Sequence, residues 1–108
     1  MPGRSPPIRH PDSQYWPYTI VRPYGTVEIE METFGYGDER VCSVFDLRGR
    51  INVKRHWHRL IRAHMRRLER IAKQSGCSEM RVAGRNWSRV LPDYEPLDGI
   101  ENGLRKRL

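Results

Sequence analysis

Three regularly spaced glutamates are the first side chains whose type and spacing could do chemistry. Glu28, Glu30 and Glu32 alternate with apolar residues, so in a strand their carboxylates lie side by side on one face. Neighbouring carboxylates raise one another's pKa and attract cations, which are the properties of a general base or a metal site. A solvated strand face gives the same pattern, neutralised by an Arg-rich element of the same or a neighbouring chain, and we favour that interpretation.

Histidines are the second candidate group. His56 and His58 lie about 200° apart on a helix, so they cannot bind the same ion. His64 falls among apolar positions, and we expect it at the edge of the core. The sequence contains no H-E-x-x-H motif. We therefore expect no metal site.

Basic side chains are the third group. The 108 residues include 20 Lys and Arg against 13 Asp and Glu, a net charge of +7, which favours an anionic partner. Trp57 falls on the apolar side of the same segment, so no aromatic residue interleaves with the cations. We therefore favour a solvated or protein-docking face over a nucleic-acid groove. The predicted basic face for a partner protein or DNA comprises Arg59, Arg62, Arg66, Arg67, Arg70 and Lys73.

One amphipathic helix, running roughly from Asn52 to Ser75, must position these cations. Asn52 is suited to the N-cap, and Gly76 to the position just after the C-terminus. Apolar residues recur at spacings of three and four, which is typical of a helix laid on a sheet. The predicted stripe comprises Val53, Trp57, Leu60, Ile61, His64, Leu68, Ile71 and Ala72.

Strands are predicted on both sides of this helix. Thr26–Phe34 alternates strictly, and Val41–Leu47 is apolar on both faces, as a central strand is. The two form an antiparallel hairpin. Glu79–Ala83 and Gly103–Leu108 read as later strands, with a short helix over Asn86–Leu91 between them. The predicted fold is α/β (α+β): a mostly antiparallel sheet with one long amphipathic helix and one short helix.

The N-terminal segment differs in composition from the rest. Residues 1–17 hold five of the eight prolines, which predicts an extended arm followed by a single domain over residues 18–108. Tyr15, Trp16 and Tyr18 are the expected docking residues of this arm, onto the domain or a partner. Thr19–Arg22 reads as a short edge strand.

Two further properties bear on location. Cys42 and Cys77 do not form a CxxC pair and read as two buried thiols of a reducing compartment. The N-terminus has no apolar run of the kind found in signal peptides, and no segment approaches the roughly 20 apolar residues of a membrane span. We expect a cytoplasmic protein, or one built into a particle assembled there, with no membrane partner.

Three motifs follow one another in the second half. The helix ends in RLERIAKQSGC over residues 67–77, the strand MRVAGR covers 80–85, and the run WSRVLPDY covers 87–94. With the order of elements from Val41 to Leu108, they resemble the C-terminal half of a GNAT acyltransferase domain. They more closely resemble the small GNAT-like proteins encoded by bacteriophages and prophages. The resemblance covers about half of the chain and implies a GNAT-like sheet.

The same resemblance argues against acyl transfer. GNAT domains that bind acetyl-CoA carry Q/R-x-x-G-x-G/A before the long helix, where backbone N–H groups approach the pyrophosphate. Here the segment reads RGRINVKR, without those glycines in either register. The general-acid Tyr that the family often places in the following short helix is also missing. We expect no catalytic residue and no cofactor. If acetyl-CoA bound through an atypical loop, its ligands would be Arg48, Gly49, Arg50, Lys54 and Arg55.

Three functions remain open from the sequence. The leading hypothesis is a non-catalytic, phage-encoded interaction or structural protein, associated with a virion or its assembly, with other proteins of that assembly as partners. The alternatives are an N-acyltransferase that uses acetyl-CoA and a sequence-independent nucleic-acid-binding protein. The sequence leaves the oligomeric state open.

Overall fold

The computed structural model describes residues 13–23, 25–51 and 54–108. Three long strands come first: β1 (Gln14–Arg22), β2 (Gly25–Tyr36) and β3 (Glu39–Ile51). The helix α1 (Lys54–Gln74) follows. Three short strands close the chain: β4 (Glu79–Val82), β5 (Glu95–Pro96) and β6 (Leu104–Arg107).

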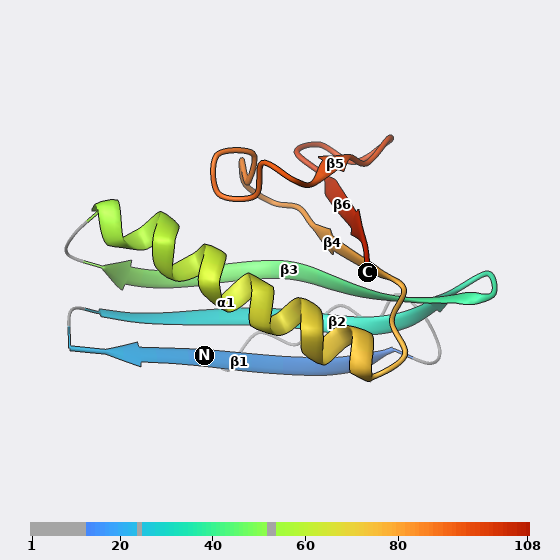
Figure 1. Ribbon diagram of the computed structural model, residues 1–108, viewed down its shortest axis with the longest axis horizontal. Coiled ribbons are helices and arrows are strands. Elements are labelled where there is room, and N and C mark those ends of the chain that lie inside the picture. The colour runs from blue at the N-terminus through green and yellow to red at the C-terminus, as the bar shows by residue number, and fades with distance from the viewer. Residues whose placement is uncertain (1–12, 24, 52–53) are drawn as a thin grey trace, which may run out of the picture.

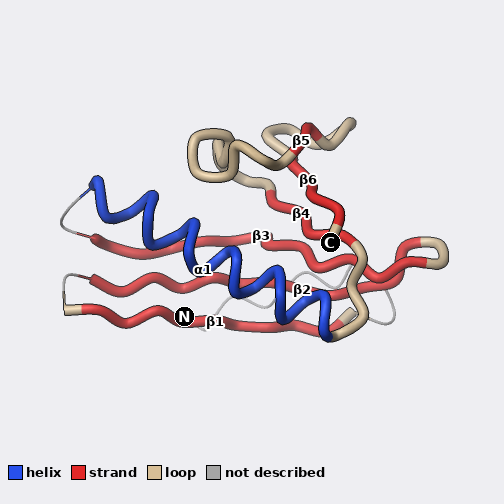
Figure 2. The backbone as a smooth tube through the Cα atoms, viewed as in Figure 1, coloured by secondary structure: helices blue, strands red, loops and turns tan. Residues whose placement is uncertain are grey.

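The strands form one sheet in the order β1-β2-β3-β4-β6-β5. All neighbours are antiparallel except β3 and β4, which the crossover through α1 makes parallel. α1 lies diagonally across one face of β1–β3 (Figure 1), and a view by secondary structure shows this single helix against the sheet (Figure 2). The prediction of a mixed α/β fold with a mostly antiparallel sheet is confirmed.

A β-bulge explains why the sequence of β3 looked apolar on both faces. Glu30 pairs with Asp46, but Met31 pairs with Val44, so Phe45 is an extra residue in β3. The bulge lets Val44 and Leu47, three positions apart, both join the core beneath α1.

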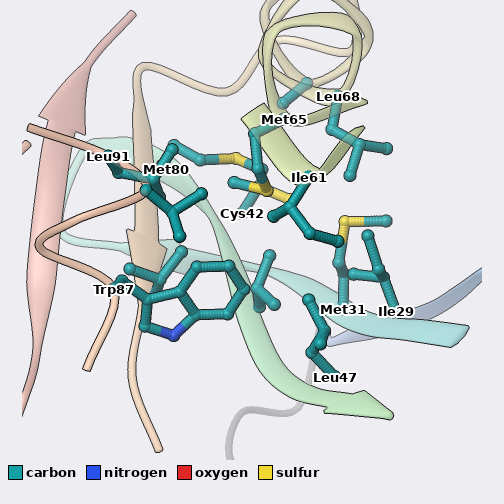
Figure 3. Close-up of a cluster of buried hydrophobic side chains, with 14 of the residues drawn as sticks. Ile29, Met31, Cys42, Leu47, Ile61, Met65, Leu68, Met80, Trp87 and Leu91 are labelled. Atoms are coloured by element: carbon teal, nitrogen blue, oxygen red, sulfur yellow. The ribbon is translucent and has the colours of Figure 1, made fainter. Parts of the chain in front are cut away.

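The core lies between α1 and the sheet and includes the segment after β4. Ile61, Met65 and Leu68 of α1 pack against Ile29 and Met31 of β2 (Figure 3). Met65, which the predicted apolar stripe did not include, is fully buried. Three further residues of the predicted stripe, Trp57, His64 and Ile71, are half-buried.

The predicted end of α1 is confirmed. Gly76 adopts a φ of 92°, the left-handed region that favours glycine. Its N–H donates to the carbonyl of Lys73, and the N–H of Cys77 donates to the carbonyl of Ala72, which together satisfy carbonyls at the helix end. The predicted N-cap, Asn52, lies outside the described residues.

The short helix predicted over Asn86–Leu91 is wrong. The segment forms a turn in which the N–H groups of Val90 and Leu91 both donate to the carbonyl of Trp87. Asn86 does act as a cap, because its side-chain oxygen accepts from the N–H of Ser88 at 3.1 Å. Pro92 follows at once and has no N–H with which to extend the turn.

The predicted boundary at residue 17 also shifts. β1 begins at Gln14, so residues 14–17 of the predicted arm belong to the sheet. Pro17 is tolerated inside β1 because β1 is an edge strand, where a missing donor breaks no ladder bond. The predicted strand Thr19–Arg22 is the second half of β1. Residues 1–12 lie outside the described residues.

Candidate functional site

The glutamate ladder of β2 lies on the face of the sheet opposite α1. Glu28 is exposed, but Glu30 and Glu32 are only 7% and 1% exposed, so the expectation of a solvated face is wrong for these two. The Tyr15 hydroxyl donates to Glu30 Oε1 at 2.8 Å, which raises the pKa of Tyr15. The Ser13 hydroxyl donates to Glu32 at 2.9 Å.

Arg48 of β3 supplies a counter-charge to part of the ladder from within the chain. Its guanidinium lies 3.2 Å from a Glu28 oxygen, 3.4 Å from Glu30 and 3.3 Å from Asp46. The acidic face therefore has its own counter-charge. Among the described residues, no cluster of three or more His, Cys, Asp or Glu side chains could hold a metal ion.

Among the residues considered for acetyl-CoA, the structure describes Arg48 and Gly49 in full. β3 continues through Ile51, so Arg48 and Gly49 lie in a strand rather than a loop. Arg48 points away from α1. A Cβ on Gly49 would lie 2.5 Å from the Thr26 carbonyl oxygen and 2.8 Å from Val27 Cα. Gly49 is thus required by the close approach of β2. The side chains of Arg50, Lys54 and Arg55 lie outside the described part of the chain.

An ionic network around the buried Glu69 joins α1 to the C-terminal segment. Glu69, 7% exposed, accepts from Tyr94 Oη at 2.6 Å, from Arg66 at 2.7 Å and from Lys106 Nζ at 3.0 Å. Asp93 closes the network through Arg66 at 2.7 Å and Lys106 at 2.9 Å. The sequence shows Glu69 as the one acid among the basic residues of the helix, but it does not show what Glu69 contacts. Its partners Tyr94 and Lys106 lie 25 and 37 residues further along the chain, and only Arg66 is close in sequence.

The network shifts the pKa values of Asp93 and Tyr94. Burial alone would raise the pKa of Asp93, but hydrogen bonds from Arg66 and Lys106 outweigh it and lower that pKa to about 2. Burial and the Glu69 carboxylate raise the pKa of Tyr94, so its hydroxyl stays a donor. Tyr94 is thus committed to an internal contact, and Arg66 is removed from the predicted basic face.

The other predicted basic residues fall into two groups. Arg62 donates to the backbone carbonyls of Val90 at 3.0 Å and Arg89 at 3.4 Å, so it tethers the turn after β4. The second group is exposed and forms no ion pair with any described residue. We call this group the free cations: Arg59, Arg67, Arg70 and Lys73.

A groove separates the N-terminal half of α1 from the segment after β4. It consists of a pocket of about 90 Å³ and an adjoining open hollow, which share His58. The groove is defined by 13 lining residues, and none of them is acidic. They are Leu47, Trp57, His58, Arg59, Ile61, Arg62, Ala63, Arg66, Arg85, Asn86, Trp87, Arg89 and Val90.

Two tryptophans line the pocket of this groove. Trp87 is buried and donates from Nε1 to the Ala83 carbonyl at 3.1 Å. Trp57 is half-buried, and the Arg85 guanidinium lies 6.0 Å from its ring centroid. The sequence placed Trp57 on the apolar stripe, where part of it does pack, but gave no sign that Arg85 and Arg89 would stand beside it.

The three predicted docking aromatics contact their own domain. Trp16 and Tyr18 pack against the core, and Tyr15 contacts Phe45 on the opposite face. The Tyr18 hydroxyl lies 2.8 Å from His64 Nδ1. His64 sits at the core edge, where burial lowers its pKa and the nearby Arg22 and Arg67 lower it further.

Comparison of the chain with protein-family models, curated sequences and solved structures finds no match. The resemblance to GNAT domains therefore stays a prediction from the sequence. No helix in the described part of the chain combines the length and apolar character needed to cross a membrane.

Proposed function

We propose that this chain is a non-catalytic interaction protein that binds an anionic partner through the outer face of α1. The free cations carry the proposal, because four exposed basic side chains that form no ion pair with any described residue lie on one helix. Between Arg59 and Lys73 they span about 21 Å at 1.5 Å per residue. Such an array raises the local potential and attracts an extended anion more than a single small one.

Three internal contacts support a non-catalytic role. Arg48 contacts the acids of β2 and β3, Gly49 accommodates the β2 backbone, and the Tyr94 hydroxyl donates to Glu69. Each of these groups has a structural partner in place of a substrate or a cofactor.

The resemblance to phage proteins implies where such a partner would be found. A virion, or an assembly on the way to one, offers both acidic protein surfaces and nucleic acid as partners. Cross-linking and mass spectrometry of particles purified from the native host would test it. Recovery of the chain cross-linked through α1 supports the setting, and its absence from the particles contradicts it.

Matched charge variants test the proposed binding face. The face variant Arg59→Gln/Arg70→Gln/Lys73→Gln and the control Gln14→Glu/Thr19→Glu/Val21→Glu lower the net charge equally, but the control changes only exposed positions of β1. On immobilised heparin, poly-glutamate and DNA, we expect the face variant to elute at much lower salt than the control. Equal elution of both variants would mean that net charge alone governs binding, and the proposal would be wrong.

A further inference from the structure

The groove beside α1 has an aromatic side chain among its basic ones. An acidic protein surface would need only the basic side chains. Its lining combines five arginines and a histidine with the half-buried ring of Trp57 and contains no carboxylate. Charge alone explains attraction of any anion. An aromatic ring at the mouth of a pocket, with a guanidinium held near it, suits a planar ring that is attached to an anion.

We propose that this groove binds single-stranded nucleic acid, with a base in the pocket beside Trp57 and the phosphate backbone along Arg59, Arg85 and Arg89. This inference rests on the proposed anion-binding function and names its partner. Proteins that bind single strands without sequence preference combine such a basic groove with aromatic stacking platforms.

The enclosed, partly apolar pocket favours a single strand over a duplex. Its volume is about 90 Å³, well above the roughly 10–15 Å³ that a single water needs in the same measure, and its lining includes Leu47, Ile61 and Trp87. A base in a duplex is stacked and paired, so it could enter only after it had been flipped out at a cost of a few kcal/mol. A single strand presents its bases already free.

The fold holds the groove open in a fixed shape. Arg62 donates to the carbonyls of Val90 and Arg89, which keeps the turn after β4 against α1. Arg66 is anchored by Glu69 and Asp93. These two arginines position the groove, so their replacement would disturb the fold and could not report binding. The informative residues are Trp57, Arg85 and Arg89.

Fluorescence anisotropy of a labelled oligo-dT tests the inference on the full chain. We expect binding whose affinity falls steeply with salt, and a loss of about tenfold on Trp57→Leu, consistent with a stacking contribution of about 1–3 kcal/mol per base. Arg85→Ala/Arg89→Ala should weaken binding similarly and reduce the salt dependence. Arg107→Ala, an exposed cation of β6 paired with Glu39, should leave the affinity unchanged.

A second readout guards against unfolding of the Trp57→Leu variant. Oligo-dT should quench the intrinsic fluorescence of the wild type, and the quenching should disappear in Trp57→Phe, which keeps most of the packing. An unlabelled duplex of equal length should compete poorly.

The outcomes separate this inference from the proposed function. If duplex competes equally, or if Trp57 and Arg85/Arg89 variants bind oligo-dT like the wild type, the groove is not the site and the inference fails. If poly-glutamate binds as tightly as oligo-dT through the free cations alone, the inference fails while the proposed function stands. Displacement of oligo-dT by micromolar acetyl-CoA would assign the groove to a cofactor and overturn both, as would the absence of binding to any polyanion.

Discussion

Neighbours, more than residue type, decide what each charged residue of this chain does. Glu69 and Glu28 are both glutamates in charged surroundings, yet Glu69 is 7% exposed and accepts three hydrogen bonds, while Glu28 is exposed beside Arg48. Arg66 and Arg70, one helical turn apart, differ in the same way, since Arg66 serves the Glu69 network and Arg70 remains free. The basic residues that the fold does not use are the ones to which we assign binding.

Removal of the Tyr94 hydroxyl should destabilise the fold without changing its shape. Tyr94→Phe keeps the buried ring but removes the donor 2.6 Å from Glu69 Oε2. A hydrogen bond to a charged acceptor contributes about 2 kcal/mol, so we expect the free energy of unfolding in urea to fall by that amount. Tyr36→Phe is the matched control, because Tyr36 is 58% exposed and should show no change. Equal loss in both variants would contradict the role assigned to the Glu69 network.

The charge of Asp93 should stabilise the fold fully above about pH 4 and progressively less below it. Its folded pKa, about 2, lies below its ordinary value of 3.8, so the folded state favours the ionised form. The stabilisation is complete above the unfolded pKa and disappears as the pH falls from about 4 towards 2. Because the side chain is 39% exposed, solvent screening keeps the effect modest.

Asp93→Asn isolates this charge while keeping the shape. Urea titrations should show a less stable variant at pH 7 and a gap to the wild type that closes as the pH falls from 4 to 2. A gap that stays constant over this range would mean that Asp93 acts through shape or hydrogen bonding alone.

At the scale of elements, the spacing between two strands limits which side chain fits at a single position. β3 passes β2 so closely at Gly49 that any side chain there meets the backbone of Thr26 and Val27. Gly49→Ala should therefore cost at least about 2 kcal/mol in the free energy of unfolding, at the upper end for an overpacked site. Thermal and urea unfolding would measure it.

Gly37→Ala provides the contrasting control at the other end of the same strands. Gly37 has open space around it but a φ of 63°. Its replacement should cost only about 1 kcal/mol, from backbone strain alone. If Gly49→Ala were the milder of the two, close approach of β2 would not be the reason for the glycine.

The sequence predicted those elements that have a clear period. β2, α1, β4 and β6 were found because alternation or helical spacing marks them over their length. Alternation shows which face Glu30 and Glu32 occupy, but not whether another side chain covers it. Pro17 obscured the first half of β1, and the two residues of β5 are too few for any pattern.

The candidate site was less predictable than the fold. The basic face followed from helical spacing, but its division into free and engaged cations depends on contacts with residues such as Val90 and Asp93, distant in sequence. The groove needs Arg85 and Arg89 beside Trp57, a juxtaposition that exists only once α1 and the turn after β4 pack together. Periodicity describes one element at a time and cannot supply such pairs.

The whole molecule is polarised by its layers. The free cations lie on the outer side of α1, while Glu28, Glu30 and Asp46 contact Arg48 on the opposite face of the sheet. One hydrophobic core lies between these two surfaces and includes residues from β1 through to Tyr94. A single core of this kind predicts that the part from β1 to α1 and the part from β4 to β6 unfold together in one cooperative transition.

The two cysteines can test that cooperativity, because they belong to different segments of the chain that meet in the core. Cys42 in β3 and Cys77 after α1 are each 4% exposed, and burial raises the pKa of Cys42 to about 12 and also raises that of Cys77. Since only an accessible thiolate reacts, neither should react appreciably with Ellman's reagent at pH 8 in the folded state. In Cys42→Ala and Cys77→Ala, the remaining thiol should become reactive at the same urea concentration, as expected if one opening exposes both. If Cys77 reacted at clearly lower urea than Cys42, the segment from β4 to β6 would open on its own, and the groove that it forms with α1 would be a movable part of the molecule.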